Sequence, residues 1–257
     1  MTPGPGSVPP VPHRRLLLAL SLLALGACGS TIPPATRPIR TVGWSPAQAR
    51  RSDRLLVLLP GRLSPPEEFR SEGLEAELAR TLGPVDQVAV DAHLGYYLGG
   101  AFVETLAEDV LVPARKAGFR DVWIVGASLG GSGALAILKK RPDLVDGLVL
   151  LAPYLGSDEV VKRVKRFGRE IRSAPPPSDP KERFFEELWA WLLTPDGARA
   201  PIAVGYGRSD RFVASHRFLS TLLPPDRVVE VDGGHDWSAW RRAMAELLRR
   251  GIGPLRR

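Results

Sequence analysis

The chain has one cysteine and four histidines among its 257 residues. One cysteine cannot form an intrachain disulfide, so the fold does not depend on such a bond in any compartment. The histidines do not cluster in the sequence, and no dinucleotide-binding glycine pattern follows an apolar run. We therefore expect neither a metal nor an organic cofactor. No apolar run reaches the about 20 residues that a membrane-spanning helix needs.

The N-terminus carries a targeting pattern. Arg14 and Arg15 precede a short apolar run over residues 16–27, which is typical of an export signal. The run ends in Leu-Gly-Ala-Cys, which resembles the bacterial lipoprotein signal and implies removal of residues 1–27 and lipidation of Cys28. An ordinary secretory signal with a stray cysteine, or an uncleaved anchor, is the alternative. The lipoprotein interpretation predicts an exported chain held by a lipid anchor on a bacterial envelope membrane, at the outer membrane or the cell surface.

Two further regions follow the signal. Residues 28–53 are rich in proline, threonine and arginine without a sustained period, which predicts a tether. Residues 54–257 are long enough for one α/β domain with a buried core.

The chain is basic, with a formal net charge of +7. Such a charge can indicate nucleic-acid binding, but no nucleic-acid motif is present, so we expect no such partner. Attraction to anionic lipid head groups and a merely arginine-rich surface both account for the charge. The sequence does not indicate an oligomeric state.

From residue 54 onward, short apolar runs alternate with longer amphipathic ones, which predicts a mostly parallel sheet of about six strands with helices on both faces. We expect strands over residues 55–59, 85–90, 122–125, 148–152, 202–206 and 228–231. We expect helices over residues 67–82, 103–117, 131–140 and 237–250.

The interval over residues 156–200 is too long for one crossover. It contains two amphipathic patterns on either side of Pro175-Pro176-Pro177, the second of them rich in phenylalanine and tryptophan. We predict a helical lid whose aromatic face lines an acyl pocket or touches a membrane. Two ordinary helices packed on the sheet are the alternative.

Ser128 lies directly after the apolar run 122–125, between Gly126 and Gly130. A G-x-S-x-G sequence between a strand and a helix is typical of a sharp turn that presents a nucleophilic serine above the sheet. A Cβ at either flanking glycine is expected to collide with the neighbouring strand or helix. Gly131 and Gly133 are expected to let the following helix approach the sheet.

A serine hydroxyl needs a general base, and in this architecture the chain order is serine, acid, histidine. His235 follows the last predicted strand and is the predicted base. His216 falls within a predicted helix and is expected to be structural, and His93 precedes the serine in the chain.

Asp210 is the predicted acid, because it follows the strand 202–206 in the loop before the histidine. A role as a helix cap is the alternative for Asp210. Asp158 is the reserve candidate for the acid, and Asp236 is expected to cap the last helix.

An oxyanion site needs two N–H donors. The backbone N–H of Leu129, directly after the serine, is the first predicted donor. The second is predicted to be the N–H of Arg62, where Gly61 permits a close approach. A plain turn is the alternative for this loop.

These features together resemble the α/β-hydrolase superfamily over about residues 55–250. The resemblance depends on the Gly-Ala-Ser-Leu-Gly stretch at 126–130, on Asp210, and on His235 after two glycines. It implies a three-layer α/β-hydrolase fold and a Ser–His–Asp triad that acts through an acyl-enzyme on esters, thioesters, amides or lactones. Two features depart from the family. The oxyanion loop reads Leu-Pro-Gly-Arg instead of the common His-Gly forms, and no pair of antiparallel strands is evident before Leu55.

The sequence therefore predicts a lipid-anchored serine hydrolase that cleaves a carboxylic ester or thioester of a small-molecule acyl substrate. A catalytically silent envelope lipoprotein with the same scaffold is one alternative. A peptidase or acyltransferase that uses the same triad is another.

Overall fold

The structure is a computed structural model that describes residue 1, residues 32–45 and residues 47–251. The chain divides into two units, Met1–Pro33 and Pro34–Arg257. The predicted signal over residues 1–27 and the predicted lipidation site at Cys28 lie outside the described residues and stay predictions. No helix in the described part of the chain is both long and apolar enough to cross a bilayer.

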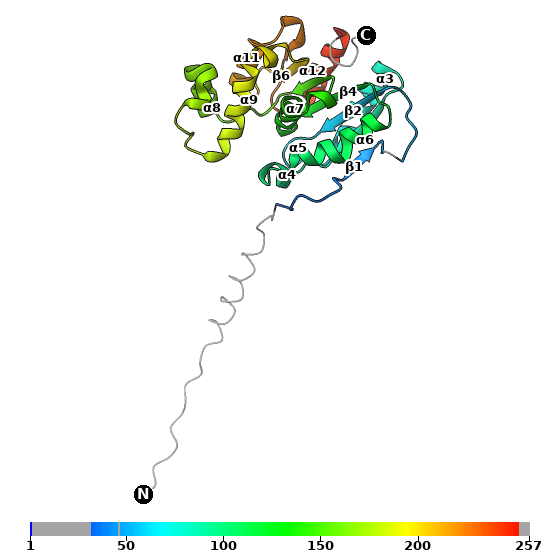
Figure 1. The fold of residues 1–257 in the computed structure, drawn as a ribbon, viewed down its shortest axis with the longest axis horizontal. Coiled ribbons are helices and arrows are strands. Elements are labelled where there is room, and N and C mark those ends of the chain that lie inside the picture. Colours follow the sequence, from blue (N-terminus) through cyan, green and yellow to red (C-terminus); the bar gives the residue numbers. More distant parts are fainter. Residues whose placement is uncertain (2–31, 46, 252–257) are drawn as a thin grey trace. The chain divides into compact units, whose positions relative to one another are not determined.

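Within the described residues of the second unit, seven strands form one sheet in the order β1-β3-β2-β4-β5-β6-β7. Figure 1 labels four of them, β1, β2, β4 and β6. The strands are β1 (Thr41–Gly43), β2 (Arg54–Leu59), β3 (Asp86–Val90), β4 (Asp121–Ala127), β5 (Gly147–Leu151), β6 (Ile202–Gly207) and β7 (Val228–Val231). All neighbouring pairs are parallel except β1 with β3. The six predicted strands are confirmed as β2 to β7.

The strand β1 corrects two predictions. It pairs antiparallel with β3 and lies within the stretch 28–53 that the sequence predicted to be a tether. Ile39 and Trp44, on either side of β1, are buried, and the Trp44 ring packs edge-on against Phe119. The sheet therefore has seven strands instead of about six. A strand of three residues shows no period, and its two apolar anchors lie outside it, so the sequence did not reveal it.

The helices deviate from prediction near glycine and proline. The predicted helix over 67–82 is two helices, α2 (Glu68–Ser71) and α3 (Leu74–Leu82), separated at Gly73, whose φ of 79° is left-handed. The predicted helix over 103–117 is α5 (Phe102–Leu106), a π-helical turn η1 (Ala107–Leu111) and α6 (Val112–Lys116). Pro113 lies in the first turn of α6, where its missing N–H is tolerated.

The remaining helices include two that the sequence did not predict, α4 (Leu94–Leu98) and α10 (Pro195–Arg199). The others are α7 (Leu129–Lys140), α8 (Asp158–Phe167), α9 (Arg183–Leu192), α11 (Val213–Ser220) and α12 (Trp237–Arg249). Short 3₁₀ turns are η2 (Pro142–Leu144), η3 (Gly168–Ser173), η4 (Pro180–Glu182) and η5 (Pro225–Arg227).

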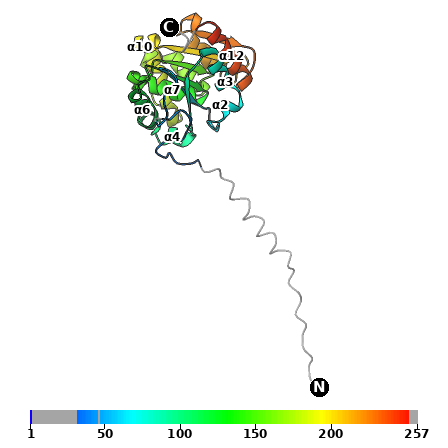
Figure 2. The same cartoon turned by 90° about the vertical axis from the view of Figure 1, so that its right-hand side faces the viewer.

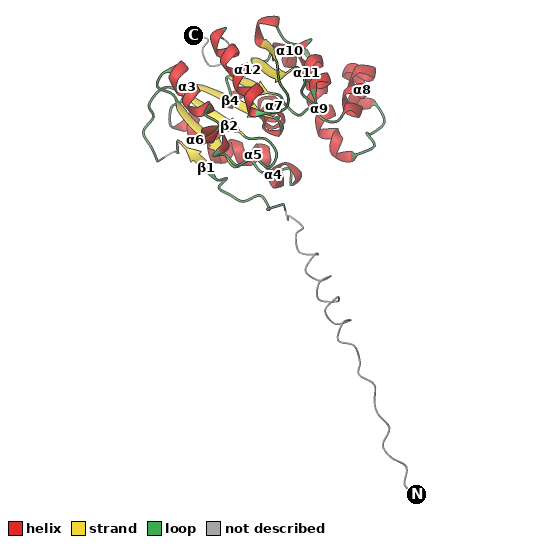
Figure 3. Cartoon of the chain, turned by 180° about the vertical axis from the view of Figure 1, so that it is seen from behind, coloured by secondary structure: helices red, strands yellow, loops and turns green. Residues whose placement is uncertain are grey.

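The helices cover both faces of the sheet and make three layers (Figures 2 and 3). Helix α7 packs against β2, β4 and β5, whereas α12 packs against β6, β7 and α3. The core between the layers is aliphatic: every residue of β5 is buried, and so is every residue of β2 after Arg54. A strand buried on both faces reads as a continuous apolar run, which explains why these strands were predictable.

The interval 156–200 forms α8, α9 and α10 between β5 and β6, and α9 packs against α7 and α8. The indole of Trp189 is buried and donates a hydrogen bond to the Leu155 carbonyl. The buried Glu186 carboxylate accepts a hydrogen bond from Arg163, with an N–O distance of 2.6 Å. The Glu186–Arg163 pair joins α9 to α8 within the segment, and the Trp189 bond and the packing of α9 on α7 connect the segment to the rest of the domain.

Candidate active site

Ser128 occupies a strained turn between β4 and α7. Its φ of 49° and ψ of −115° lie outside the helical and extended regions, at a cost of about 1–3 kcal/mol. Hydrogen bonds on both sides hold the residue there, because its N–H donates to the Leu151 carbonyl and its carbonyl accepts from the Tyr154 N–H. The turn therefore stays fixed by its ties to β5 and the loop after it.

Gly126 and Gly130, on either side of Ser128, have no room for a side chain because backbone atoms occupy the space. A Cβ at position 126 would lie 2.5 Å from the Gly130 carbonyl oxygen, and a Cβ at position 130 would lie 2.1 Å from the Leu59 carbonyl oxygen. Gly133 serves a different purpose from the predicted one. A Cβ there would lie 2.6 Å from the Tyr97 hydroxyl and 2.7 Å from the Phe102 ring, so Gly133 makes room for α4 and α5 and not for the sheet.

His235 connects Ser128 to Asp210 across the carboxyl edge of the sheet. Its Nε2 lies 2.9 Å from the Ser128 hydroxyl oxygen, and its Nδ1 lies 2.8 Å from Asp210 Oδ2. The loop that carries His235 runs from β7 to α12, whereas Asp210 follows β6. The structure thus brings together the three residues that the sequence analysis named.

Asp210 has a second partner. Its Oδ1 accepts a hydrogen bond of 2.8 Å from the Phe212 N–H, so both carboxylate oxygens are engaged. Burial raises the pKa of Asp210, but the hydrogen bonds from His235 and from the Phe212 N–H outweigh burial and hold the pKa below its usual value. The carboxylate is therefore ionised at neutral pH and oriented toward the imidazole.

The other residues weighed for these roles lie elsewhere. Asp158 is the exposed first residue of α8, and the His93 ring caps α4 by accepting from the Gly95 N–H. Asp236 caps α12, as predicted, because it accepts from the Ala239 N–H. His216 is fully buried in α11, and its Nε2 lies 3.0 Å from the Pro153 carbonyl oxygen.

Burial of His216 gives a testable pH dependence. Desolvation lowers the pKa of His216 to about 4, although the charge of Asp210 opposes this shift. Below about pH 6.5 the unfolded chain binds a proton that folded His216 does not, so the free energy of unfolding must fall as the pH drops toward 4. We expect this residue to remove about 2 kcal/mol between pH 8 and pH 5.

Urea unfolding of wild type and His216→Gln at these two pH values measures this contribution. The glutamine amide retains a donor for Pro153 and does not titrate, so the variant should lose about 2 kcal/mol less over the interval than wild type does. Equal losses in both proteins would show that His216 is protonated as readily in the folded state as in the unfolded state.

The predicted oxyanion loop lies against Ser128. A Cβ at Gly61 would lie 3.4 Å from the Ser128 Cβ, so a larger residue at position 61 would crowd the serine. Within the part of the chain that the structure describes, the N–H groups of Leu129 and Arg62 donate to no other residue. Two free donors on either side of the serine are what an oxyanion site requires.

A cavity of about 1070 Å³ opens at Ser128. Residues from the interval 156–200 line it, among them Phe184, Phe185 and Leu188 of α9. Tyr97 and Phe102, from α4 and α5, line it too, and the sequence analysis missed this wall. A helix of five residues next to Gly99-Gly100 gives no periodic signal. The paired tyrosines before these glycines were the available clue.

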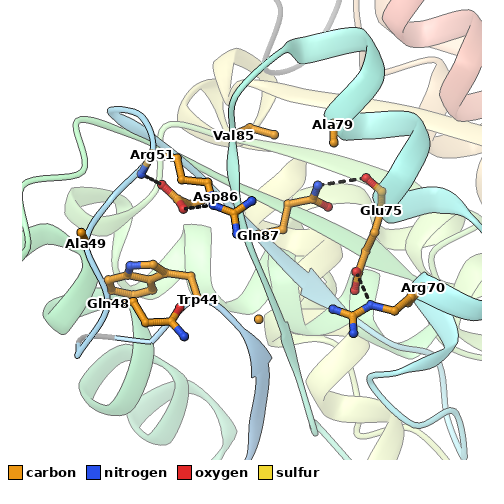
Figure 4. A pocket seen from close by; sticks show the side chains of 11 residues that line it. Trp44, Gln48, Ala49, Arg51, Arg70, Glu75, Ala79, Val85, Asp86 and Gln87 are labelled. Carbon is orange, nitrogen blue, oxygen red and sulfur yellow. Dashed lines mark hydrogen bonds and ion pairs between the residues drawn. The ribbon is translucent and has the colours of Figure 1, made fainter.

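A second cavity, of about 530 Å³, lies at the start of β3 (Figure 4). Gln87 donates to the Glu75 carbonyl there, and the Asp86 carboxylate accepts from the Arg51 N–H. The amino ends of parallel strands lie at the edge opposite to Ser128, so this cavity is remote from the serine. Its lining contains no serine, cysteine or histidine, and it therefore lacks a nucleophile–base pair.

Within the described residues, no group of three histidine, cysteine or acidic side chains is arranged to hold a metal ion. Ser128 and His235 line the large cavity, and Asp210 contacts the imidazole of His235 through Nδ1 without lining the cavity itself.

The sheet, its helices and the sharp turn at Ser128 define an α/β-hydrolase fold. The chain belongs to the esterase family, because the family model described as "Putative esterase" matches residues 97–250. The matched stretch contains Ser128, Asp210 and His235, whereas Gly61 and Arg62 precede it.

Solved structures share this fold at low sequence identity. Rv0554 from Mycobacterium tuberculosis aligns with a TM-score of 0.53 at 15% identity over 83% of this chain and 92% of that chain. S-formylglutathione hydrolase (FrmB) from Staphylococcus aureus aligns with a TM-score of 0.51 at 13% identity over 84% and 98%. A ferulic acid esterase aligns with a TM-score of 0.50 at 17% identity over 79% and 85%. No sequence among the curated proteins matches this chain.

Proposed function

We propose that the protein is a serine hydrolase that cleaves a carboxylic ester or thioester through an acyl-enzyme on Ser128. The continuous hydrogen-bonded path from the Ser128 hydroxyl through His235 to the Asp210 carboxylate carries this proposal. Neutral Nε2 accepts the serine proton, Nδ1–H donates to Asp210, and the carboxylate stabilises the imidazolium that forms.

In the proposed reaction, Ser128 Oγ attacks the substrate carbonyl carbon while its proton passes to His235. The N–H groups of Leu129 and Arg62 donate to the oxyanion of the tetrahedral intermediate. The carbon–oxygen or carbon–sulfur bond to the leaving group breaks as the imidazolium returns the proton to it. Water then attacks the acyl-serine with His235 as base, releases the acid and restores the free hydroxyl.

A labelling experiment distinguishes the proposed hydrolase from a catalytically silent protein with the same fold. Treatment with a fluorophosphonate probe, followed by trypsin and mass spectrometry, is expected to place one adduct on the peptide 121–139, which contains Ser128 and Ser132. Fragmentation distinguishes these serines. Ser132 is the internal control, because its hydroxyl donates to the Tyr154 carbonyl and has no histidine partner among the described residues.

An adduct on Ser128 and hydrolysis of p-nitrophenyl acetate are both expected. Folded protein that acquires no adduct would support the scaffold instead. A panel of amides and peptides, and assays with added alcohols as acceptors, separate an esterase from a peptidase or an acyltransferase that uses the same residues.

A further inference from the structure

The cavity at Ser128 extends along one face of α7 to the far end of that helix. Leu129, Ala136 and Lys140 all line it. These residues are spaced by seven and four positions, which places them on the same helical face. The distance from Ser128 to Lys140 along the helix is about 18 Å at 1.5 Å per residue. The cavity is therefore a long groove, which we call the α7 groove.

The walls of the α7 groove carry apolar side chains along α4, α5 and α9 and are partly open to solvent, and the acidic side chains of Asp179, Glu182 and Glu187 also line the cavity. One wall comes from α4 and α5, with Leu98 and Val103, and the other comes from α9, with Phe184 and Leu188. Leu98 is 54% exposed and Phe184 is 38% exposed. Among the described residues from 34 to 251, the exposed large hydrophobic side chains are these two and Leu63, and all three line this cavity. Apolar side chains gathered at one groove mark a surface that an apolar ligand covers.

The far end of the groove is basic. Lys139 lies 3.7 Å from the Glu187 carboxylate and also donates to the Glu187 carbonyl, so its charge is matched. Lys140, one residue further, has no carboxylate within ion-pair distance among the described residues. Arg62, Lys181 and Arg211 also line the cavity without an ion pair among the described residues, and of the lining cations Lys140 is the one at the far end of α7. The groove thus combines a nucleophile at one end, apolar side chains along its length and an unmatched cation at the other end.

We propose that the α7 groove binds an ester whose long apolar chain ends in an anionic group, with the ester at Ser128 and the anion at Lys140. This assignment deepens the proposed function and rests on it. An extended chain advances about 1.2 Å per bond, so a chain of roughly ten to fourteen carbons spans the groove. The substrate class is accordingly a long-chain anionic amphiphile.

The test uses p-nitrophenyl esters in four forms, below their micelle-forming concentrations: acetyl, succinyl, dodecanoyl and ω-carboxydodecanoyl. A second series places the same chains on the alcohol side of an acetate ester. For wild type we expect kcat/KM for the long anionic ester to exceed that for acetate by at least roughly 100-fold. The kcat/KM for the long anionic ester should also exceed that for the dodecanoyl ester, which ends in a methyl group, by about tenfold in one of the two series. We expect most of this difference in KM.

Two variants test the two parts of the proposal, the anion site at Lys140 and the apolar channel at Ala136. Lys140→Glu is expected to remove the tenfold preference for the ω-carboxylate, and Ala136→Phe to remove most of the preference for long chains, each expressed as a ratio to acetate. Ala136→Leu is the milder replacement if the phenylalanine variant does not fold. Lys162→Glu, at an exposed position on α8 outside the groove, is the matched charge control and should change neither ratio.

Ratios in the Lys140 and Ala136 variants that equal those of wild type in both series would overturn the assignment. A gain for the succinyl ester as large as that for the long anionic ester would place the anion near Ser128 and would also overturn it. A preference for long chains without any gain from the carboxylate would contradict the anionic end. Failure of wild type to hydrolyse any ester would instead contradict the proposed function.

Discussion

Replacing Ser128 by alanine should lower kcat/KM for p-nitrophenyl acetate by at least about 10⁴-fold and abolish fluorophosphonate labelling. The expected loss is large because the variant removes the only atom that is proposed to form a bond to the substrate. Alanine has the same Cβ as serine, so the strained backbone with φ of 49° is no worse in the variant. The free energy of unfolding should therefore change little.

Ser132→Ala is the matched control for this experiment. Its hydroxyl lies one helical turn further along α7 and donates to the Tyr154 carbonyl, so its loss removes one structural hydrogen bond. We expect this control to retain activity within about tenfold of wild type. Circular dichroism and thermal unfolding of both variants are the measurements that check whether they are folded. A Ser128→Ala protein with activity near wild type would exclude the acyl-enzyme on this residue.

Replacing Asp210 by asparagine should reduce kcat by about 10⁴-fold without unfolding the protein. The reason lies in the second contact of Asp210. Its Oδ1 accepts from the Phe212 N–H, so the asparagine oxygen must stay there and the amide nitrogen must face His235. A donor facing Nδ1 selects the tautomer with the proton on Nε2. That tautomer cannot accept the Ser128 proton.

Asp236→Asn is the matched control, because Asp236 adjoins the histidine and serves the helix instead of the imidazole. Its Oδ1 accepts from the Ala239 N–H and its Oδ2 accepts from the Gly234 N–H. Asparagine is an equally good N-cap and keeps the first contact, whereas it loses the second, which is a single backbone hydrogen bond in the loop. We expect less than about tenfold loss of kcat in this control. If Asp210→Asn and Asp236→Asn lose activity equally, Asp210 does not select the tautomer of His235, and its proposed role is wrong.

The six strands β2 to β7 were predictable because the signal for each was local. Leu55 to Leu59 form an uninterrupted apolar run, as a strand buried on both faces requires. The residues that escaped prediction lack such a signal. Strand β1 has three residues and depends on its antiparallel partner β3, and α4 has five residues between a capping histidine and two glycines. Elements this short are stabilised by tertiary contacts, and no period in the sequence reports them.

The residues of the serine turn were predictable for a related reason. Gly126 and Gly130 are needed because other backbone atoms occupy the space where a Cβ would lie, and a motif records that need. The purpose of Gly133 was not predictable. The rings that fill its space come from α4 and α5, about 30 residues earlier in the chain, and the sequence does not say which helix they pack against.

By itself, the sequence determined the class of fold, the position of the candidate serine in its turn and the order in which Asp210 and His235 follow it. These are properties of chain order and of local pattern. Only the tertiary structure decided that His235 reaches both Ser128 and Asp210 at hydrogen-bonding distance, and that the cavity continues along α7 between walls from α4, α5 and α9. The reason is physical: a hydrogen bond depends on positions within a few tenths of an ångström, and such positions follow from the packing of distant elements.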